Sequence, residues 1–160
     1  MSREATIESE SHAIKCELAA EVLRSSGWLW LQVGGWSMLP TVFPGDTLLI
    51  ERSDSDEVVE GDIVLFSRDR RLFAHRFVRR VDVAGHEILT RGDAMPAADA
   101  TVRRQEMLGK IVLISRNGKH IKPRKRMHLT EWAVAACVQR SEIAARLVVK
   151  VHSLRQTSPV

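Results

Sequence analysis

The spacing of hydrophobic residues along the chain changes twice, which divides the chain into three segments. Residues 11–26 carry apolar side chains at helical spacing, and Gly27 follows as a residue that typically ends a helix. The apolar positions of this helical pattern are Ile14, Leu18, Val22 and Leu23. The first segment, residues 1–27, is therefore predicted to be an N-terminal helical arm.

The middle segment has the shorter period of β-strands. Its apolar runs are DTLLIER, DIVLF, LFAHRFVRRVD, EILTR and GKIVLIS, separated by glycine, aspartate and asparagine. Residues 116–119 and the pair Ala84 and Gly85 have the composition of hairpin turns. Residues 28–122 are therefore predicted to form an antiparallel, largely all-β domain. Before these runs, GWLWLQV is interpreted either as a buried strand or as a surface patch that contacts lipid or an apolar peptide.

A helical period returns beyond Pro123, with Thr130 at the position expected of an N-cap. The residues expected on one face of this helix are Ala133, Ala136, Cys137, Ile143, Ala144, Leu147, Val148 and Val151. Because Gln139, Arg140 and Glu142 interrupt the apolar residues, the pattern favours an amphipathic helix over a membrane span. Residues 123–160 are predicted to be a basic linker and a helix packed on the β domain, with binding to a partner or a membrane surface as the alternative.

Composition and charge narrow the class of protein. With 160 residues, 44% of them apolar and 28% charged, the chain has the size and composition of one globular domain with terminal arms. The net charge of +4 owes much to the run from Lys119 to Arg126. That run has no interleaved aromatic residues, which favours a solvated linker and disfavours binding to nucleic acid.

The cysteines and the lack of targeting signals in the sequence bear on its cellular location. Cys16 and Cys137 are too few for a disulfide framework or a metal site of known spacing, and both are predicted to be buried thiols. The N-terminal residues include early acids and no continuous apolar stretch, unlike a secretory signal. No later segment has the roughly 18 apolar residues of a membrane span. We therefore expect a cytoplasmic or peripherally membrane-associated protein.

Candidate chemistry begins at GGWSMLPTVFPGD, residues 34–46, where Ser37 follows two glycines and a tryptophan. A serine hydroxyl becomes a nucleophile only when a base removes its proton and donors stabilise the oxyanion. Gly34 and Gly35 would allow a sharp turn and a close approach to a substrate. By composition alone, an inert loop is the more common meaning of such a turn.

Among the six histidines, His75 differs from the others because it lies in the middle of a predicted strand. Alternation along LFAHRFVRR places Phe73, His75 and Phe77 on one face. Such a histidine is either a satisfied core residue or a general base, since imidazoles titrate near pH 6.5. Two carboxylates follow the next strand in RGDAMPAAD, Asp93 and Asp99, and either would orient an imidazole or cap a turn.

The order of these pieces resembles the catalytic domain of the signal peptidase I superfamily, which includes the self-cleaving LexA-type repressors. The segments that carry the resemblance are SMLPT, PGD, GDIVLF, AHRFV, TRGDAMPAAD and LGKIV, over about residues 34–112. Most bacterial members have a lysine base, whereas the archaeal and endoplasmic-reticulum type has histidine followed by arginine, as in His75 and Arg76. The chain therefore resembles the histidine branch.

The resemblance implies an antiparallel signal-peptidase/LexA-like β-barrel in which Ser37 is the nucleophile and His75 the general base. It matches the functional aspartate to Asp99 and gives Asp93 a supporting place. It implies no metal or organic cofactor, and a peptide or preprotein substrate with small residues before the scissile bond. The expected function is a serine endopeptidase that processes a leader or signal segment.

Two features differ from the signal peptidase pattern. The usual membrane anchor before the serine is replaced by a charged arm, although Trp28, Trp30 and Trp36 allow peripheral membrane contact. Signal peptidases often have a serine that assists the oxyanion hole where this chain has Gly35. The alternatives are a self-cleaving LexA-like regulator, whose DNA-binding part has little room in the short N-terminal arm, and a catalytically silent peptide-binding β module.

Overall fold

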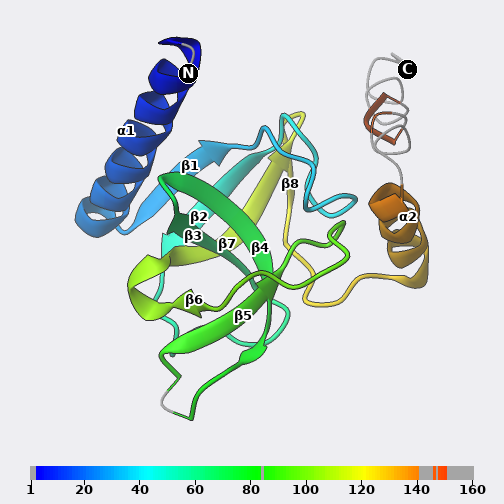
Figure 1. Ribbon diagram of the computed structural model, residues 1–160. Helices are drawn as coiled ribbons and strands as arrows, with labels where there is room; N and C mark the ends of the chain where they lie inside the picture. Colours follow the sequence, from blue (N-terminus) through cyan, green and yellow to red (C-terminus); the bar gives the residue numbers. More distant parts are fainter. Residues whose placement is uncertain (1–2, 84, 141–145, 147, 151–160) are drawn as a thin grey trace.

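The computed structural model describes residues 3–83, 85–140, 146 and 148–150, and its core is an antiparallel β-sheet between two helices (Figure 1). The helices are α1 (Arg3–Ser26) and α2 (Leu129–Arg140), and a 3₁₀ helix, η1 (Arg104–Glu106), precedes β7. The strands are β1 (Trp28–Gln32), β2 (Thr47–Arg52), β3 (Ile63–Arg68), β4 (Arg71–Arg80), β5 (Glu87–Arg91), β6 (Val102–Arg103), β7 (Met107–Arg116) and β8 (Lys119–Ile121). The prediction of a mainly antiparallel β fold with a helix at each end is confirmed.

The sheet has the strand order β1-β2-β7-β3-β4-β5-β6, and β8 pairs with one end of β7. It is not closed, so the expected barrel is wrong in this respect: β1 and β6 are the two ends of the described order. One predicted turn is confirmed, because Asn117 and Gly118 adopt left-handed φ angles of 50° and 73° between β7 and β8. The other hairpin joins β4 and β5, but Ala84 lies outside the described residues.

Strand β3 is buried on both faces, as its continuous apolar run IVLF indicates. Ile63 and Leu65 belong to one hydrophobic cluster with residues of β2, β7 and α1. Val64 and Phe66 belong to a second cluster with Phe77 of β4. His75 pairs with Val64 across the β3–β4 ladder, so the candidate base sits beside the core strand of the domain.

Helix α1 packs only in part with the predicted positions. The predicted Leu23 is buried, together with Cys16 and Ala19, whereas the predicted Ile14 and Leu18 are more than 60% exposed. Small side chains allow the helix to approach the sheet closely, and this arrangement leaves the larger Ile14 and Leu18 outside. The helix begins at Arg3, earlier than its apolar pattern indicates, and Gly27 ends it with a left-handed φ of 81° and a bond from its N–H to the Leu23 carbonyl.

Helix α2 also differs from expectation. It begins at Leu129, and the backbone N–H of His128 donates to the Glu131 carboxylate, so Thr130 is not the N-cap. Its packed residues are Val134, Ala135 and Val138, whereas Ala133 and Cys137 are exposed. The expected face is therefore wrong at Ala133 and Cys137, and so is the buried state of Cys137, whereas the expected Val148 packs against the same cluster. The predicted positions Ile143, Ala144, Leu147 and Val151 lie outside the residues whose side chains are described.

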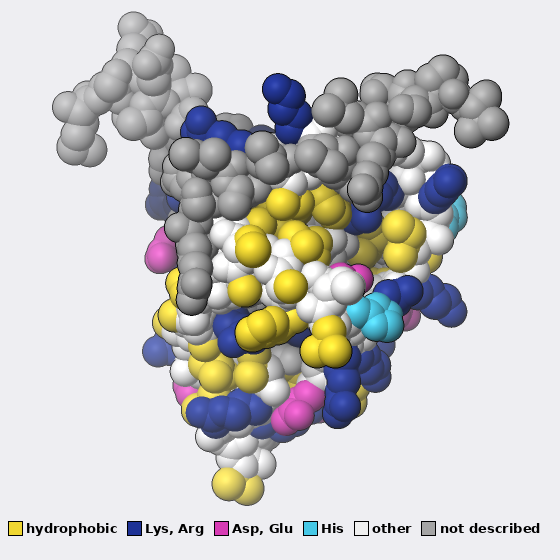
Figure 2. Space-filling model, turned by 90° about the vertical axis from the view of Figure 1, so that its right-hand side faces the viewer, with side chains coloured by type: hydrophobic (Ala, Val, Ile, Leu, Met, Phe, Trp, Pro, Cys, Tyr) yellow, Lys and Arg dark blue, Asp and Glu magenta, His cyan; other side chains and the backbone are white. Residues whose placement is uncertain are grey.

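Besides its packed residues, α2 has apolar side chains that face solvent: Leu129 is 88% and Trp132 61% exposed. Figure 2 faces the side of the molecule on which α2 lies and shows hydrophobic side chains gathered in the middle with lysine and arginine side chains around them. In β1 the side chains of Leu29 and Leu31 pack against the core, as a buried strand requires, while Trp28 and Trp30 point outward. Contact of these tryptophans with lipid or an apolar peptide stays a prediction. No helix in the described part of the chain is long and apolar enough to cross a membrane.

Candidate active site

Ser37 begins the turn that connects β1 to β2. Two backbone bonds close the base of this loop, from the Val33 N–H to the Asp46 carbonyl and from the Gly45 N–H to the Val33 carbonyl, each 2.8 Å long. The buried Asp46 carboxylate accepts from the Phe43 N–H and from the Arg116 guanidinium. The loop that carries Ser37 is therefore held by strand-end hydrogen bonds and by a partly buried ion pair between Asp46 and Arg116.

His75 occupies the middle of β4 and is only 5% exposed. Its ring packs edge-on against Phe66 and at an angle to Phe73, with centroid distances of 5.9 Å in both cases. Phe73 was expected from strand alternation, whereas Phe66 comes from the neighbouring strand β3. The aromatic contacts fix the ring plane and keep bulk water from most of the imidazole.

Ser37, His75 and Asp99 are brought together in one line of hydrogen bonds. His75 Nε2 lies 3.0 Å from Ser37 Oγ, and His75 Nδ1 lies 2.7 Å from Asp99 Oδ2. The buried Thr90 hydroxyl donates to the same Asp99 oxygen at 2.7 Å. A carboxylate can only accept, so Nδ1 carries the hydrogen and, in the neutral ring, Nε2 presents its lone pair to the serine hydroxyl.

The charge of Asp99 supports this tautomer. Burial raises the pKa of the Asp99 carboxyl, but the hydrogen bonds from His75 and Thr90, together with the charges of His75 and Arg68, outweigh burial and bring the pKa below its ordinary value of 3.8. Asp99 is therefore ionised at neutral pH and remains an acceptor for Nδ1.

The loop that carries Asp99 is fixed from its far side by Arg68 of β3. Arg68 donates to the Ala100 carbonyl at 2.9 Å and to the Thr101 carbonyl at 2.6 Å. The same guanidinium forms two hydrogen bonds with Glu106, at 3.1 and 3.0 Å. This bidentate pair orients the arginine, which in turn fixes the residues that directly follow Asp99.

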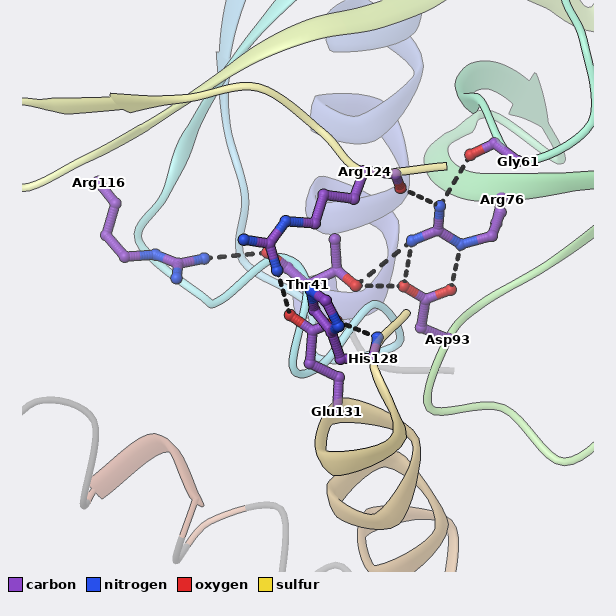
Figure 3. Close-up of polar contacts among 8 residues, drawn as sticks. All are labelled: Thr41, Gly61, Arg76, Asp93, Arg116, Arg124, His128 and Glu131. Carbon is purple, nitrogen blue, oxygen red and sulfur yellow. Dashed lines mark hydrogen bonds and ion pairs between the residues drawn. The ribbon is translucent and has the colours of Figure 1, made fainter. Parts of the chain in front are cut away.

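Asp93 does not contact His75 and belongs to a second network (Figure 3). Its carboxylate accepts two hydrogen bonds of 2.7 Å from Arg76, from Nε and Nη2, and one from the Thr41 hydroxyl. Thr41 lies in the turn of Ser37, and Arg76 directly follows His75. Asp93 therefore connects the candidate nucleophile loop to the strand of the candidate base, whereas Asp99 orients the imidazole itself.

Arg76 also connects this network to the C-terminal part of the chain. Its Nη1 donates to the Gly61 carbonyl at 2.8 Å and to the Arg124 carbonyl at 2.7 Å (Figure 3). Gly61 has a left-handed φ of 93°, and a Cβ there would lie 2.4 Å from the Lys125 carbonyl oxygen. The absence of a side chain at Gly61 thus lets the linker after β8 approach Arg76.

Helix α2, which follows this linker, also contacts the loops of the candidate site. Val138 packs in a cluster with Leu39 and Phe43 of the Ser37 loop and with Ala94, which follows Asp93. Gln139 donates from Nε2 to the Met95 carbonyl at 3.3 Å. Residues beyond the β domain therefore contact both loops of the candidate site.

Gly92 lies close to both candidate catalytic residues, Ser37 and His75. A Cβ at Gly92 would lie 2.7 Å from the Ser37 carbonyl oxygen and 3.2 Å from His75 Nε2. Two residues further along the same loop, the Ala94 N–H donates to the Ser37 carbonyl at 2.8 Å, so the loop and the Ser37 turn are in direct contact. Only a residue without a side chain allows this close approach.

A cleft of about 670 Å³ opens beside Ser37. Its walls come from the end of β1, the residues that lead to Ser37, the start of β4 and helix α1. The backbone N–H of Ser37 makes no hydrogen bond with any described residue, so it remains available as an oxyanion donor. Gly34 and Gly35 also line the cleft; neither has a left-handed φ and no atom lies within 4 Å of a Cβ built on either, so the sharp turn expected from them is not observed.

Sequence reasoning missed Thr90, Arg68 and Gly92 as parts of the site. Thr90 and Gly92 lie in LTRGD, and alternation from the buried Ile88 would have placed Thr90 on an interior face, where a hydroxyl needs a partner. Arg68 gave no signal, because its partners Ala100 and Glu106 are distant in sequence. The described residues contain no cluster of three or more side chains suited to hold a metal ion.

An antiparallel sheet that aligns a serine, a histidine and a carboxylate beside an open cleft has the organisation of a serine-peptidase-like protein. Residues 3–112 match the model of the family described as Peptidase S24-like, and the chain belongs to this family, within the LexA/signal peptidase-like superfamily. The match starts before the residues that carried the resemblance and ends at the same position, Val112. No curated protein sequence matches the chain significantly.

Proposed function

We propose that the protein is a serine endopeptidase in which Ser37 is the nucleophile and His75 the general base, and that it acts on a leader or signal segment of a peptide or protein substrate. The observation that carries the proposal is the 3.0 Å contact between Ser37 Oγ and His75 Nε2, continued by the 2.7 Å contact from Nδ1 to Asp99. A serine that is merely a loop residue has no need of an oriented imidazole.

The proposed mechanism uses only groups in this chain. His75 Nε2 accepts the Ser37 proton as Oγ attacks the peptide carbonyl, and Asp99 stabilises the imidazolium that forms. The Ser37 N–H donates to the oxyanion. The imidazolium then gives its proton to the leaving amine, which produces an acyl-enzyme, and a water activated by His75 releases the acid.

The assignment to the histidine branch of the superfamily is part of the proposal. Among the described residues, no lysine side chain bonds to Ser37. Arg76, which follows His75 in the chain, donates its hydrogen bonds to Asp93 and to the carbonyls of Gly61 and Arg124. A guanidinium does not lose its proton in proteins. His75 is thus the described base in contact with the hydroxyl.

The way a substrate binds follows from open strand edges. Residues 71–75 of β4 pair with β3 on one side, whereas the ladder to β5 begins only at Arg76. Strand β1 pairs only with β2 among the described strands. An extended peptide that adds to these edges lies along the cleft and passes Ser37. We propose, from the family resemblance, that it carries small residues before the scissile bond.

A fluorophosphonate probe, which reacts with activated serines, tests the proposal. We expect labelling of the wild-type chain at Ser37, none in Ser37→Ala, and a rate at least about 10³-fold lower in His75→Ala. Ser25→Ala, at the exposed end of α1, serves as the control and should label normally. A folded wild-type protein that remains unlabelled from pH 6 to 9 would identify a silent peptide-binding module instead.

Intact-mass measurement separates the remaining alternative. A peptidase that acts on other chains keeps its full mass during incubation and cleaves added peptides. A self-cleaving regulator shortens itself, and Ser37→Ala stops the shortening.

A further inference from the structure

The cleft beside Ser37 has an apolar floor and a cationic rim. The floor consists of aliphatic and aromatic side chains from β1, the Ser37 loop, β3 and β4, among them Leu31, Met38 and Leu72. The basic side chains that line it are His12 and Lys15 of α1 and Arg71 of β4. None of the described residues that line this cleft is acidic.

Lys15 and Arg71 are free to bind a ligand. Both side chains are exposed, and neither forms an ion pair or a hydrogen bond with another described residue. The helix positions one turn from Lys15, which are Ser11, His12, Leu18 and Ala19, include no acid. Other arginines near the site, such as Arg68 and Arg76, have carboxylate partners. Lys15 and Arg71 thus differ from these two arginines in having no acidic partner among the described residues.

The position of Arg71 indicates where a charge on the substrate would lie. Arg71 precedes His75 by four positions on β4, and alternation places both on the same face of the strand. At about 3.3 Å per residue this spacing is roughly 13 Å. A peptide extended along the open edge of residues 71–75 would therefore bring a side chain opposite Arg71 about four residues from its scissile bond.

Resting on the proposed function, we propose that the substrate carries an acidic side chain about four residues from the scissile bond, and that Arg71 and Lys15 bind it. The apolar floor takes the residues in between. The two cations line the same cleft from different elements, Lys15 from α1 and Arg71 from β4. Because these groups are solvent-exposed, salt screens the interaction.

The test uses the full-length chain and internally quenched peptides with alanines around the scissile bond. In matched sets, each position out to six residues on either side carries Glu, Gln or Lys, and mass spectrometry maps the cleavage site. We expect the Glu peptide with the charge about four residues from the cut to have a KM roughly fivefold below the Gln peptide, as for one or two exposed ion pairs. The Lys peptide should have the highest KM, and 0.5 M salt should reduce the differences.

Charge reversal makes the test specific. In the double variant K15E/R71E the preference should invert, so that the Lys peptide becomes the better substrate. Arg79→Glu reverses an exposed charge on the same strand outside the cleft and should keep the preference for Glu. Equal KM values for the three peptides at every position, or an unchanged preference in the double variant, would overturn the inference.

The outcomes also separate this inference from the proposed function. If Ser37 is not labelled by the probe and no peptide is cut, the proposed function fails. If peptides are cut without regard to charge, only the acidic-substrate inference fails. Should Ser37 label normally while the library is not cut, the same peptides are tested as competitors of labelling: stronger protection by Glu peptides supports the inference, and equal protection overturns it.

Discussion

Asp93 binds Arg76 through two parallel hydrogen bonds of 2.7 Å, and the pair is separate from the hydrogen bond between Asp99 and His75. The two aspartates follow the same strand six residues apart, yet one neutralises the partly buried Arg76 guanidinium and the other bonds to an imidazole. Substitution should therefore affect different properties of the protein.

Asp93→Asn should mainly destabilise the fold. The Asp93 side chain is 2% and the Arg76 side chain 13% exposed, so loss of the carboxylate leaves a largely enclosed cation without its counter-charge. We expect the free energy of unfolding to fall by about 3–5 kcal/mol. Urea denaturation measures this change, and a variant as stable as the wild type would contradict the structural role of the pair.

Asp99→Asn should instead reduce activity while the fold persists. An amide in place of the carboxylate can donate to Nδ1 and so favours the wrong imidazole tautomer for proton transfer from Ser37. We expect kcat on a cleaved peptide to fall roughly 10²–10⁴-fold with a smaller loss of stability than in Asp93→Asn. A larger loss of kcat in Asp93→Asn and a larger loss of stability in Asp99→Asn would contradict these two roles.

The sequence alone left the choice between these aspartates open for a physical reason. Both stand in RGDAMPAAD, and the path of that loop is decided by bonds to distant residues, such as Ala94 to the Ser37 carbonyl and Arg68 to Ala100. The alternation of apolar and polar residues within a strand, in contrast, depends only on neighbouring positions in the sequence, and it predicted strands β2 to β5 and β7 well. The packed faces of the helices were predicted only in part: Leu23 packs as expected, but Ala19 and Ala135 also pack closely, while larger apolar residues such as Ile14 and Leu18 stay exposed.

The pH dependence of activity should report the loss of the proton from the general base. A general base must be neutral to accept the Ser37 proton, so kcat/KM should rise with pH as the His75 imidazolium is lost. The pKa of Asp99 is held below 3.8, which means that its carboxylate is lost only in stronger acid and does not contribute to this rise. A rate that falls from pH 6 to 8 would argue against His75 as the base.

Gly92→Ala tests the close approach between the loop and the candidate pair. The new Cβ would meet the Ser37 carbonyl oxygen at 2.7 Å, so the nucleophile turn must shift away from His75. We expect a loss of roughly 10²-fold in kcat, as for a displacement of about 1 Å. Gly118→Ala, where nothing lies within 4 Å, is the control, and an active Gly92→Ala enzyme would show that the spacing is not critical.

Gly61→Ala tests whether the C-terminal linker supports the site. Its Cβ would lie 2.4 Å from the Lys125 carbonyl, which must move, together with the neighbouring Arg124 carbonyl that accepts from Arg76. Gly27→Ala is the matched control: its φ is also left-handed at 81°, but a Cβ there meets nothing within 4 Å. Both variants should lose about 1–2 kcal/mol of stability from the backbone conformation. Only Gly61→Ala should also lower kcat. Equal activities in the two variants would show that the contact between the linker and Arg76 does not affect activity.

Gly35→Ser should increase activity if the chain works as proposed. In the signal peptidases that the sequence resembles, a serine at this position assists the oxyanion hole, and here the Ser37 N–H is the donor that remains available. The φ of Gly35 is not left-handed and no atom lies within 4 Å of a Cβ built there, so a serine side chain fits without strain. An added donor to the transition state raises kcat more than it changes KM, by up to about 10²-fold. Steady-state kinetics with one peptide measure this effect, and Gly34→Ser, equally open but one residue further from Ser37, should give no increase. A Gly35→Ser enzyme no faster than the wild type would mean that the oxyanion forms elsewhere in the cleft.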